Sequence, residues 1–210
     1  MYLCIDTISE SAGITIVNTD SAVFLPLDPQ NSSESIISII DKVLKQSGAT
    51  LSDLSGVFVI KGPGSFTGLR VGLTVANQFA HQLRIPIVGL CQDEWWLART
   101  DEPEALYLQT MNKAEVYLSK EGRSSIKDVQ ELASYSPAKW LGQVSDEHRS
   151  WLPSDFLEIQ ELLSVEETWR KVTQKNLDRD LPRRTYEAVE PFYGKDPAIT
   201  KSKKQLSLWR

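Results

Sequence analysis

The feature that most constrains the fold is a glycine-rich turn between a short apolar segment and a long helical pattern. Residues 56–60 are apolar and precede the turn, residues 68–84 follow it with apolar side chains at helical spacing, and residues 85–90 are apolar again. A strand, a loop, a helix and a second strand in this order form a βαβ unit. Such a unit pairs its two strands in parallel through a right-handed crossover. The sequence therefore predicts an α/β protein.

Further elements are predicted on both sides of this unit. In the first half, the apolar residues 2–6, 13–18 and 22–27 predict strands, and residues 33–47 predict a helix. In the second half, strands are predicted at 105–111, 114–120, 127–132 and 156–160, helices at 137–144 and 165–177, and a loop at 145–153. Both halves open with an apolar strand and a hairpin, which leaves a duplicated domain open.

The composition is that of a globular protein of the cytoplasm. No run of 18 apolar residues is present, so no membrane span is expected. The first six residues lack a basic region and a cleavage site and are expected to form a strand, not a secretory signal. Cys4 and Cys91 both lie in apolar runs, which favours free thiols in a reducing compartment.

The charge is that of a protein which does not hold nucleic acid by itself. The net charge is −5, whereas phosphate binding requires clustered cations. Residues 201–210 carry four cations and no anion. This basic tail is either a solvated chain end or a contact for RNA or an acidic partner.

The glycine-rich turn itself has two interpretations. Gly62, Gly64 and Gly68 permit positive φ angles and the close approach of a ligand or of another part of the chain. Ser65 can cap the helix that follows, and such a helix end can bind a phosphate or carboxylate. The spacing matches neither a P-loop nor a GxGxxG fingerprint. A tight structural turn and an anion site both remain open here.

The helices predicted at 33–47 and 68–84 have unusually wide apolar faces. Helices of this kind pack on more than one side. One side is expected to cover the sheet, and the other to meet either the neighbouring helix or a partner protein. The candidate interface residues are Ile36, Ile40, Val43, Leu69, Gly72, Leu73, Ala76 and Ala80.

The turn also carries a family resemblance. Residues 61–72, KGPGSFTGLRVG, resemble the signature of the TsaB (YeaZ) family, which the catalytic paralogue TsaD shares in looser form. LCIDT at 3–7, IVGL at 87–90, EVY at 115–117 and VEPFY at 189–193 are similar to other family segments. The resemblance spreads over nearly the whole chain and is strongest between residues 3 and 90.

The resemblance implies an actin-like (ribonuclease H-like) fold of two lobes, with mixed sheets flanked by helices. The first lobe would span residues 1–100, and a divergent, reduced second lobe residues 101–210. The implied function is that of a non-catalytic scaffold that activates TsaD. It would dimerise with TsaD, or with a second copy of itself, through the two first-lobe helices. TsaE completes the implied complex, which modifies an adenosine of tRNA, and ATP and Mg²⁺ belong to the complex and not to this subunit alone.

The sequence departs from the family pattern at two places. Ser32 stands where the family has a histidine before the first helix, and Thr110-Met-Asn112 stands where it has Asp-Ala-Arg. Asp6, Thr7, Gly62, Gly64 and Ser65 are the candidates for contacting nucleotide phosphates. Thr110 replaces the acid expected at the matching turn of the second lobe.

Neither catalytic nor metal-ligating residues are predicted. The two histidines, His81 and His148, are far apart in sequence and do not form the His-x-x-x-His pair of catalytic TsaD proteins. Ser65 does not lie in a Gly-x-Ser-x-Gly elbow. An autonomous actin-like ATPase or kinase is the alternative function, and a peptidase-like activity is a third that lacks metal ligands.

Overall fold

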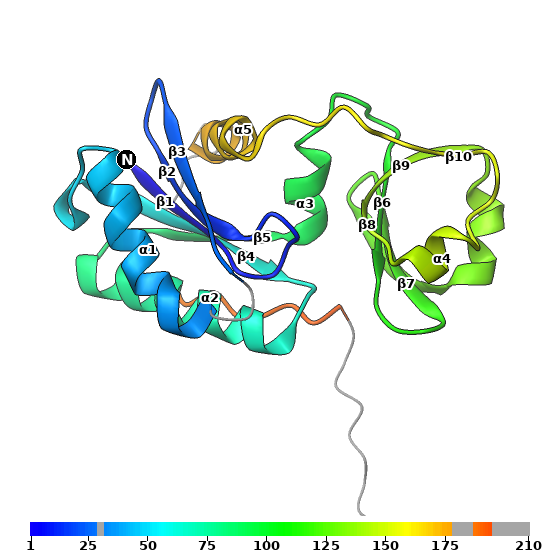
Figure 1. Cartoon of the computed structure of the whole chain (residues 1–210), viewed down its shortest axis with the longest axis horizontal. Helices are drawn as coiled ribbons and strands as arrows, with labels where there is room; N and C mark the ends of the chain where they lie inside the picture. Colours follow the sequence, from blue (N-terminus) through cyan, green and yellow to red (C-terminus); the bar gives the residue numbers. More distant parts are fainter. Residues whose placement is uncertain (29–31, 178–186, 195–210) are drawn as a thin grey trace, which may run out of the picture.

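The computed structural model describes residues 1–28, 32–177 and 187–194, which contain two five-stranded mixed sheets (Figure 1). The first sheet has the order β3-β2-β1-β4-β5. β1, β2 and β3 pair with one another as an antiparallel meander, whereas β4 pairs in parallel with both β1 and β5. These strands are β1 (Tyr2–Asp6), β2 (Gly13–Val17), β3 (Ala22–Pro26), β4 (Gly56–Gly62) and β5 (Ile87–Cys91).

The second sheet repeats this topology. Its order is β10-β9-β6-β7-β8, with an antiparallel β6-β7-β8 meander and β9 parallel to both β6 and β10. Its strands are β6 (Leu106–Thr110), β7 (Glu115–Lys120), β8 (Arg123–Asp128), β9 (Ala138–Gln143) and β10 (Phe156–Glu158). The two halves therefore share one strand order and one set of strand directions, which is the pattern of a duplicated unit.

The second lobe is reduced in its helices and not in its sheet. In the first lobe, α1 (Ser32–Gln46) and the short 3-10 turn that follows it at Leu51–Asp53 connect β3 to β4, and α2 (Phe66–Leu83) connects β4 to β5. The matching connections of the second lobe are the 3-10 helix η2 (Val129–Tyr135) and α4 (Asp146–Arg149). Thus 15 and 18 residues of helix become 7 and 4.

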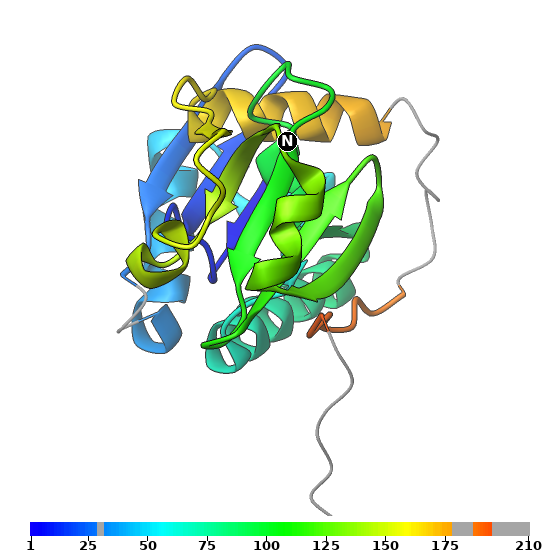
Figure 2. The same ribbon diagram turned by 90° about the vertical axis from the view of Figure 1, so that its right-hand side faces the viewer.

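The first sheet is the middle layer of a three-layer lobe. Because successive strand residues point to opposite faces, Leu3 and Ile5 face α1 and α2, whereas Cys4 faces the opposite layer. That opposite layer contains α3 (Gln92–Leu97) and α5 (Val165–Leu177), and Figures 1 and 2 show α5 lying across the first sheet. Burial on both faces explains why these strands are almost continuously apolar.

A boundary after residue 100 therefore does not divide the chain into its packing units. α5 follows the second sheet in sequence but packs on β2 and β3. Val189 and Phe192, near the end of the described chain, also pack against first-lobe residues. The first lobe is completed by segments that follow the second one.

Most predicted elements are confirmed, including the 165–177 helix. The helix predicted at 137–144 is wrong: this segment is β9, in which the adjacent Trp140 and Leu141 are buried in different clusters. The strand predicted at 127–132 ends at Asp128, whose side chain caps η2. The loop predicted at 145–153 contains α4.

No helix in the described part of the chain is long and apolar enough to cross a membrane. Residues 201–210, the predicted basic tail, lie outside the described residues.

The return of α5 to the first lobe predicts a large energetic role for Trp169. This side chain is 1% exposed, and its ring centroid lies 6.0 Å from that of Trp95. Trp169→Ala should lower the free energy of unfolding by about 3–5 kcal/mol, because it removes a large buried ring and leaves a cavity. Urea unfolding measures this loss. Lys175→Ala, on the exposed side of the same helix, is the control and should change stability by less than about 0.5 kcal/mol. Equal effects of the two substitutions would contradict the packing of α5 on the first sheet.

Candidate functional site

The glycine-rich turn joins β4 to α2 and is filled by other parts of the same chain. Ser65 is the N-cap of α2, and its hydroxyl accepts a hydrogen bond from the amide of Gly68 at 3.4 Å. Gly62 has a φ of 124°, and a Cβ added there would lie 1.9 Å from the carbonyl oxygen of Phe192. A Cβ on Gly64 would lie 2.7 Å from Ile8. These glycines are required because the chain packs closely against them.

Asp6 and Thr7, at the turn after β1, are also engaged within the fold. The carboxylate of Asp6 is buried and accepts hydrogen bonds from the amides of Ile8 and Ser9, both at 3.0 Å, and from the hydroxyl of Ser9. Burial raises the pKa of Asp6, although these hydrogen bonds oppose the shift. The hydroxyl of Thr7 donates to the carbonyl of Gly68 at 2.7 Å.

The structure thus brings together the turns that hold the candidate phosphate contacts. Ile8 packs against Gly64, and Thr7 packs against Gly68. The polar side-chain atoms of Asp6 and Thr7, however, form hydrogen bonds within these turns. This geometry favours the interpretation of a tight structural turn over that of an anion site.

The matching turn of the second lobe is closed in a similar way. β6 ends at Thr110, as β1 ends at Asp6. The hydroxyl of Thr110 accepts a hydrogen bond from the amide of Ser145 at 2.9 Å and lies 3.1 Å from Nδ1 of His148. Ser145 caps α4, as Ser65 caps α2. The duplication therefore extends from the strands to the helix caps beside them.

His148 is a buried titratable residue whose contacts the sequence did not predict. It is 1% exposed, and its Nε2 lies 3.0 Å from the carbonyl oxygen of Lys113, which can only accept. Nε2 therefore carries the proton, and Nδ1 can accept from Thr110 when the ring is neutral. His148 lies 38 residues after Thr110 and 35 after Lys113, so no local pattern indicates these contacts.

Neither cysteine takes part in a disulfide, as predicted. Burial raises the pKa of the Cys4 thiol, and it raises that of Cys91 to about 11. Across the described residues, no group of three or more His, Cys, Asp or Glu side chains is placed to hold a metal ion.

The eight residues predicted as a partner interface are wrong as surface contacts, because all are buried within the first lobe. Seven are 0–4% exposed, and Gly72 is also buried. They pack between the two helices and the sheet, where an apolar periodicity cannot distinguish the protein's own core from a partner. Substitutions at Ile40 or Ala76 would therefore test folding and not docking. The residues are Ile36, Ile40, Val43, Leu69, Gly72, Leu73, Ala76 and Ala80.

The two helices nevertheless present an apolar groove, whose lining shares only Ile36 with the predicted set. A groove of about 460 Å³ lies between α1 and α2. Ile37 is 55% exposed and Phe66 57% exposed, which is unusual for large apolar side chains. The guanidinium carbon of Arg70 lies 5.4 Å from the centroid of the Phe66 ring. The groove is lined by Ile36, Ile37, Phe66, Thr67, Arg70, Val71, Thr74 and Val75.

Ile37 and Phe66, the two exposed groove residues, are absent from the predicted interface, and Phe66 also lies outside the predicted helix. It lies inside the glycine-rich turn motif, where the helical pattern had not begun, because α2 starts two residues earlier than predicted. The sequence signal that could have indicated Phe66 is a large apolar residue within a segment of glycine, serine and threonine. A large apolar residue in such a polar segment either packs inward or is exposed for binding.

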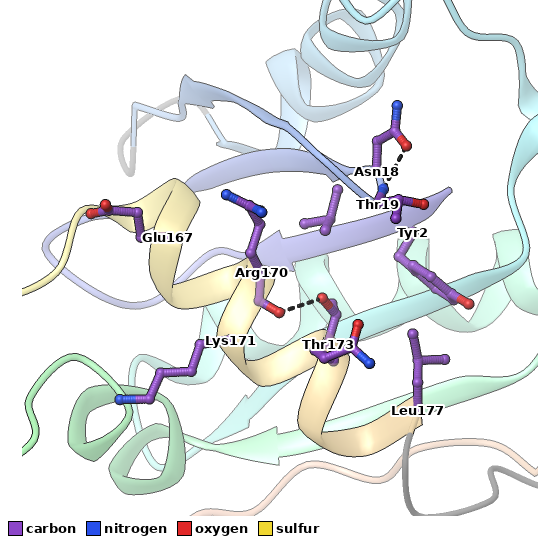
Figure 3. Close-up of a pocket in the computed structure, with 10 residues that line it drawn as sticks. Tyr2, Asn18, Thr19, Glu167, Arg170, Lys171, Thr173 and Leu177 are labelled. Atoms are coloured by element: carbon purple, nitrogen blue, oxygen red, sulfur yellow. Dashed lines mark hydrogen bonds between the residues drawn. The ribbon is translucent and has the colours of Figure 1, made fainter.

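A second hollow, of about 440 Å³, lies between α5 and the strands β1 and β2 (Figure 3). Its lining is mixed: Tyr2 and Leu177 are close to polar side chains such as Asn18 and Arg170. Lys171 is paired with Asp101 at 2.8 Å and extends away from Arg170. The two cations therefore do not converge on one anion. None of the predicted phosphate contacts lines this hollow.

The chain is similar to proteins that are named for tRNA modification. The family model of tRNA N6-adenosine threonylcarbamoyltransferase (TsaD) matches residues 27–162. The tRNA threonylcarbamoyladenosine biosynthesis protein TsaB of Escherichia coli K12 is 30% identical over 89 residues, which are 42% of this chain and 38% of that protein. The protein of the same name from Bacillus subtilis 168 is 34% identical over 87 residues, which are 40% of this chain and 38% of that protein. The matches thus span well under half of these relatives.

Solved structures match over more of the chain. YeaZ from Pseudomonas aeruginosa superposes with a TM-score of 0.74 at 18% identity, covering 91% of this chain and 98% of that one. A crystal structure described as an uncharacterized protein with similarity to peptidase YEAZ, also from Pseudomonas aeruginosa, gives a TM-score of 0.75 at 17% identity, covering 92% and 99%. At this identity the likeness shows the fold.

The close contact between Thr7 and α2 predicts a measurable coupling. A Cβ on Gly72 would lie 2.3 Å from the hydroxyl oxygen of Thr7. Gly72→Ala should therefore destabilise the protein by about 1–3 kcal/mol, although alanine is the better helix former by about 1 kcal/mol. Combining it with Thr7→Ala removes the clash, so the double variant should lose at least about 0.5 kcal/mol less than the sum of the single losses. Urea unfolding of the four proteins gives the coupling, and strict additivity would argue against this contact as the reason for the glycine.

Proposed function

Because this chain belongs to the tRNA N6-adenosine threonylcarbamoyltransferase (TsaD) family and within it is of the TsaB (YeaZ) type, we propose that it is a non-catalytic subunit of the machinery that forms threonylcarbamoyladenosine on tRNA. It docks on TsaD through the groove between α1 and α2 and activates it. The observation that carries this proposal is the exposure of Ile37 and Phe66 in that groove. The protein acts in the cytoplasm, where tRNA is the substrate of the complex.

The chemistry of the groove suits an apolar partner surface. Exposed apolar side chains gathered in a groove mark interaction sites. Full burial of a side chain such as Ile37 or Phe66 contributes about 1.5–3 kcal/mol. Arg70, close to the Phe66 ring, adds a residue type that is enriched where binding energy is concentrated.

The hydrogen bonding in the turns after β1 and β6 supports a non-catalytic role for this chain. The Asp6 carboxylate accepts hydrogen bonds from the amides and hydroxyl of its own turn. The Thr110 hydroxyl forms hydrogen bonds with Ser145 and His148. Neither residue is arranged to hold Mg²⁺ or a phosphate, so ATP and Mg²⁺ would bind at the level of the complex. TsaE would join that complex. Without TsaD, a second copy of this chain would occupy the same groove as a homodimer.

The first prediction of this proposal concerns docking. The tagged chain should retain TsaD at physiological salt, and Ile37→Asp should weaken the affinity at least about tenfold by placing a charge in the apolar groove. Leu157→Asp is the matched control: Leu157 is 62% exposed but lies on β10 in the second lobe. Calorimetry measures the affinities, and the level of modified adenosine in cells measures the consequence. Absence of TsaD binding, or equal binding by both variants, would sink the proposal. Ile37→Asp should also abolish self-association in analytical ultracentrifugation.

The second prediction concerns ATP. The purified chain should hydrolyse ATP no faster than its Asp6→Asn variant, because the Asp6 carboxylate is already occupied within its turn. Release of inorganic phosphate is the measurement. Turnover that Asp6→Asn removes while the variant remains folded would favour the autonomous ATPase instead.

A further inference from the structure

Residues 187–194, here called the strap, connect two surfaces of the first lobe. The strap contains no helix or strand. Figures 1 and 2 show it running beside α2 toward the end of β4. The side chain of Asn77 in α2 fixes the strap at Val189. Its Nδ2 donates to the Val189 backbone carbonyl at 3.0 Å, and its Oδ1 accepts from the Val189 backbone amide at 2.9 Å. The side chain of Val189 also fills the space beside Gly89.

Phe192 places the strap in the seam between the lobes. Its amide donates to the carbonyl of Lys61, at the end of β4, at 2.7 Å. Its ring packs edge-on against Tyr117 of β7, with ring centroids 6.1 Å apart. Tyr117 belongs to the second sheet and is 2% exposed. One strap residue therefore contacts both lobes beside the glycine-rich turn.

Tyr193, the next residue, faces the groove side. Its ring stacks on Phe66, with centroids 5.6 Å apart and planes inclined by 28°. Consecutive side chains of an extended segment point to opposite sides, so one residue can hold the seam while its neighbour holds a groove residue. The position of Phe66 at the groove thus depends on a segment that is anchored between the lobes.

We propose that the strap couples partner docking in the α1–α2 groove to closure of the seam between the lobes. This inference rests on the proposed function, because it assigns a regulatory link to the same docking surface. A partner that covers the exposed part of Phe66 also stabilises the stack with Tyr193. That stack retains its geometry while Phe192 stays in the seam, so docking favours the closed seam. Coupling of this kind is reciprocal: a strap held in the seam strengthens docking by the same factor.

The test measures both directions of the coupling with the full chain and purified TsaD. Phe192→Ala empties the seam contact without altering a residue that lines the groove, and it should weaken TsaD affinity about tenfold, within the usual range of such couplings. Conversely, bound TsaD should slow hydrogen exchange of the peptide that contains the Phe192 amide. Asn77→Ala loosens the strap at its other anchor and should also weaken binding. Trp151→Ala, an exposed aromatic of the second lobe, is the control and should leave affinity unchanged.

The outcomes separate this inference from the proposed function. If Ile37→Asp abolishes TsaD binding while Phe192→Ala and Asn77→Ala bind normally and exchange is unaltered, the coupling is overturned and the docking proposal stands. If the unaltered chain does not bind TsaD, both fail. Circular dichroism shows whether Phe192→Ala is folded, and if it is not, the affinity of Asn77→Ala decides.

Discussion

The contact on which the rest of the structure depends is the close packing of the first turn against the start of α2. Thr7 bonds to the carbonyl of Gly68 and lies beside Gly72, and Ile8 fills the space beside Gly64. Since side chains larger than hydrogen would not fit there, this contact sets the angle at which α2 leaves the sheet. The orientation of α2 in turn determines which of its residues form the core and which form the groove with α1.

Because the topology is duplicated, the second lobe has a matching contact between its first turn and a helix, but there the helix is short. In the second lobe, the turn after β6 meets a helix of only four residues, and Thr110 bonds to the helix cap Ser145 and to His148. A short helix cannot present a long apolar face. The proposed docking surface therefore lies in the lobe with the long helices, while the second lobe contributes its sheet to the seam.

The sequence predicts the first lobe well because its signals are local and mutually consistent. Apolar runs alternate with polar turns, and the glycine-rich turn separates strand from helix. The failures have physical causes. In β9, Trp140 and Leu141 are buried on opposite faces of a central strand, and this yields an apolar density that resembles a buried helix. The predicted interface residues belong to the protein's own core. An apolar periodicity indicates that a side chain is buried, but it does not indicate whether the same chain or a partner buries it. The strap has no periodicity, so its position depends wholly on tertiary contacts.

These contacts give each part of the KGPGSFTGLRVG segment a physical reason. Gly62 admits the carbonyl of Phe192, Gly64 admits Ile8, and Ser65 caps α2. Phe66 is left exposed where the groove and the strap meet, between Arg70 and Tyr193. A phosphate-binding turn would keep its glycines open to a ligand, whereas this turn closes them with its own chain and directs its one aromatic side chain outward. Under the proposed function, the segment builds a surface for recognition, and the partner that docks there supplies the chemistry.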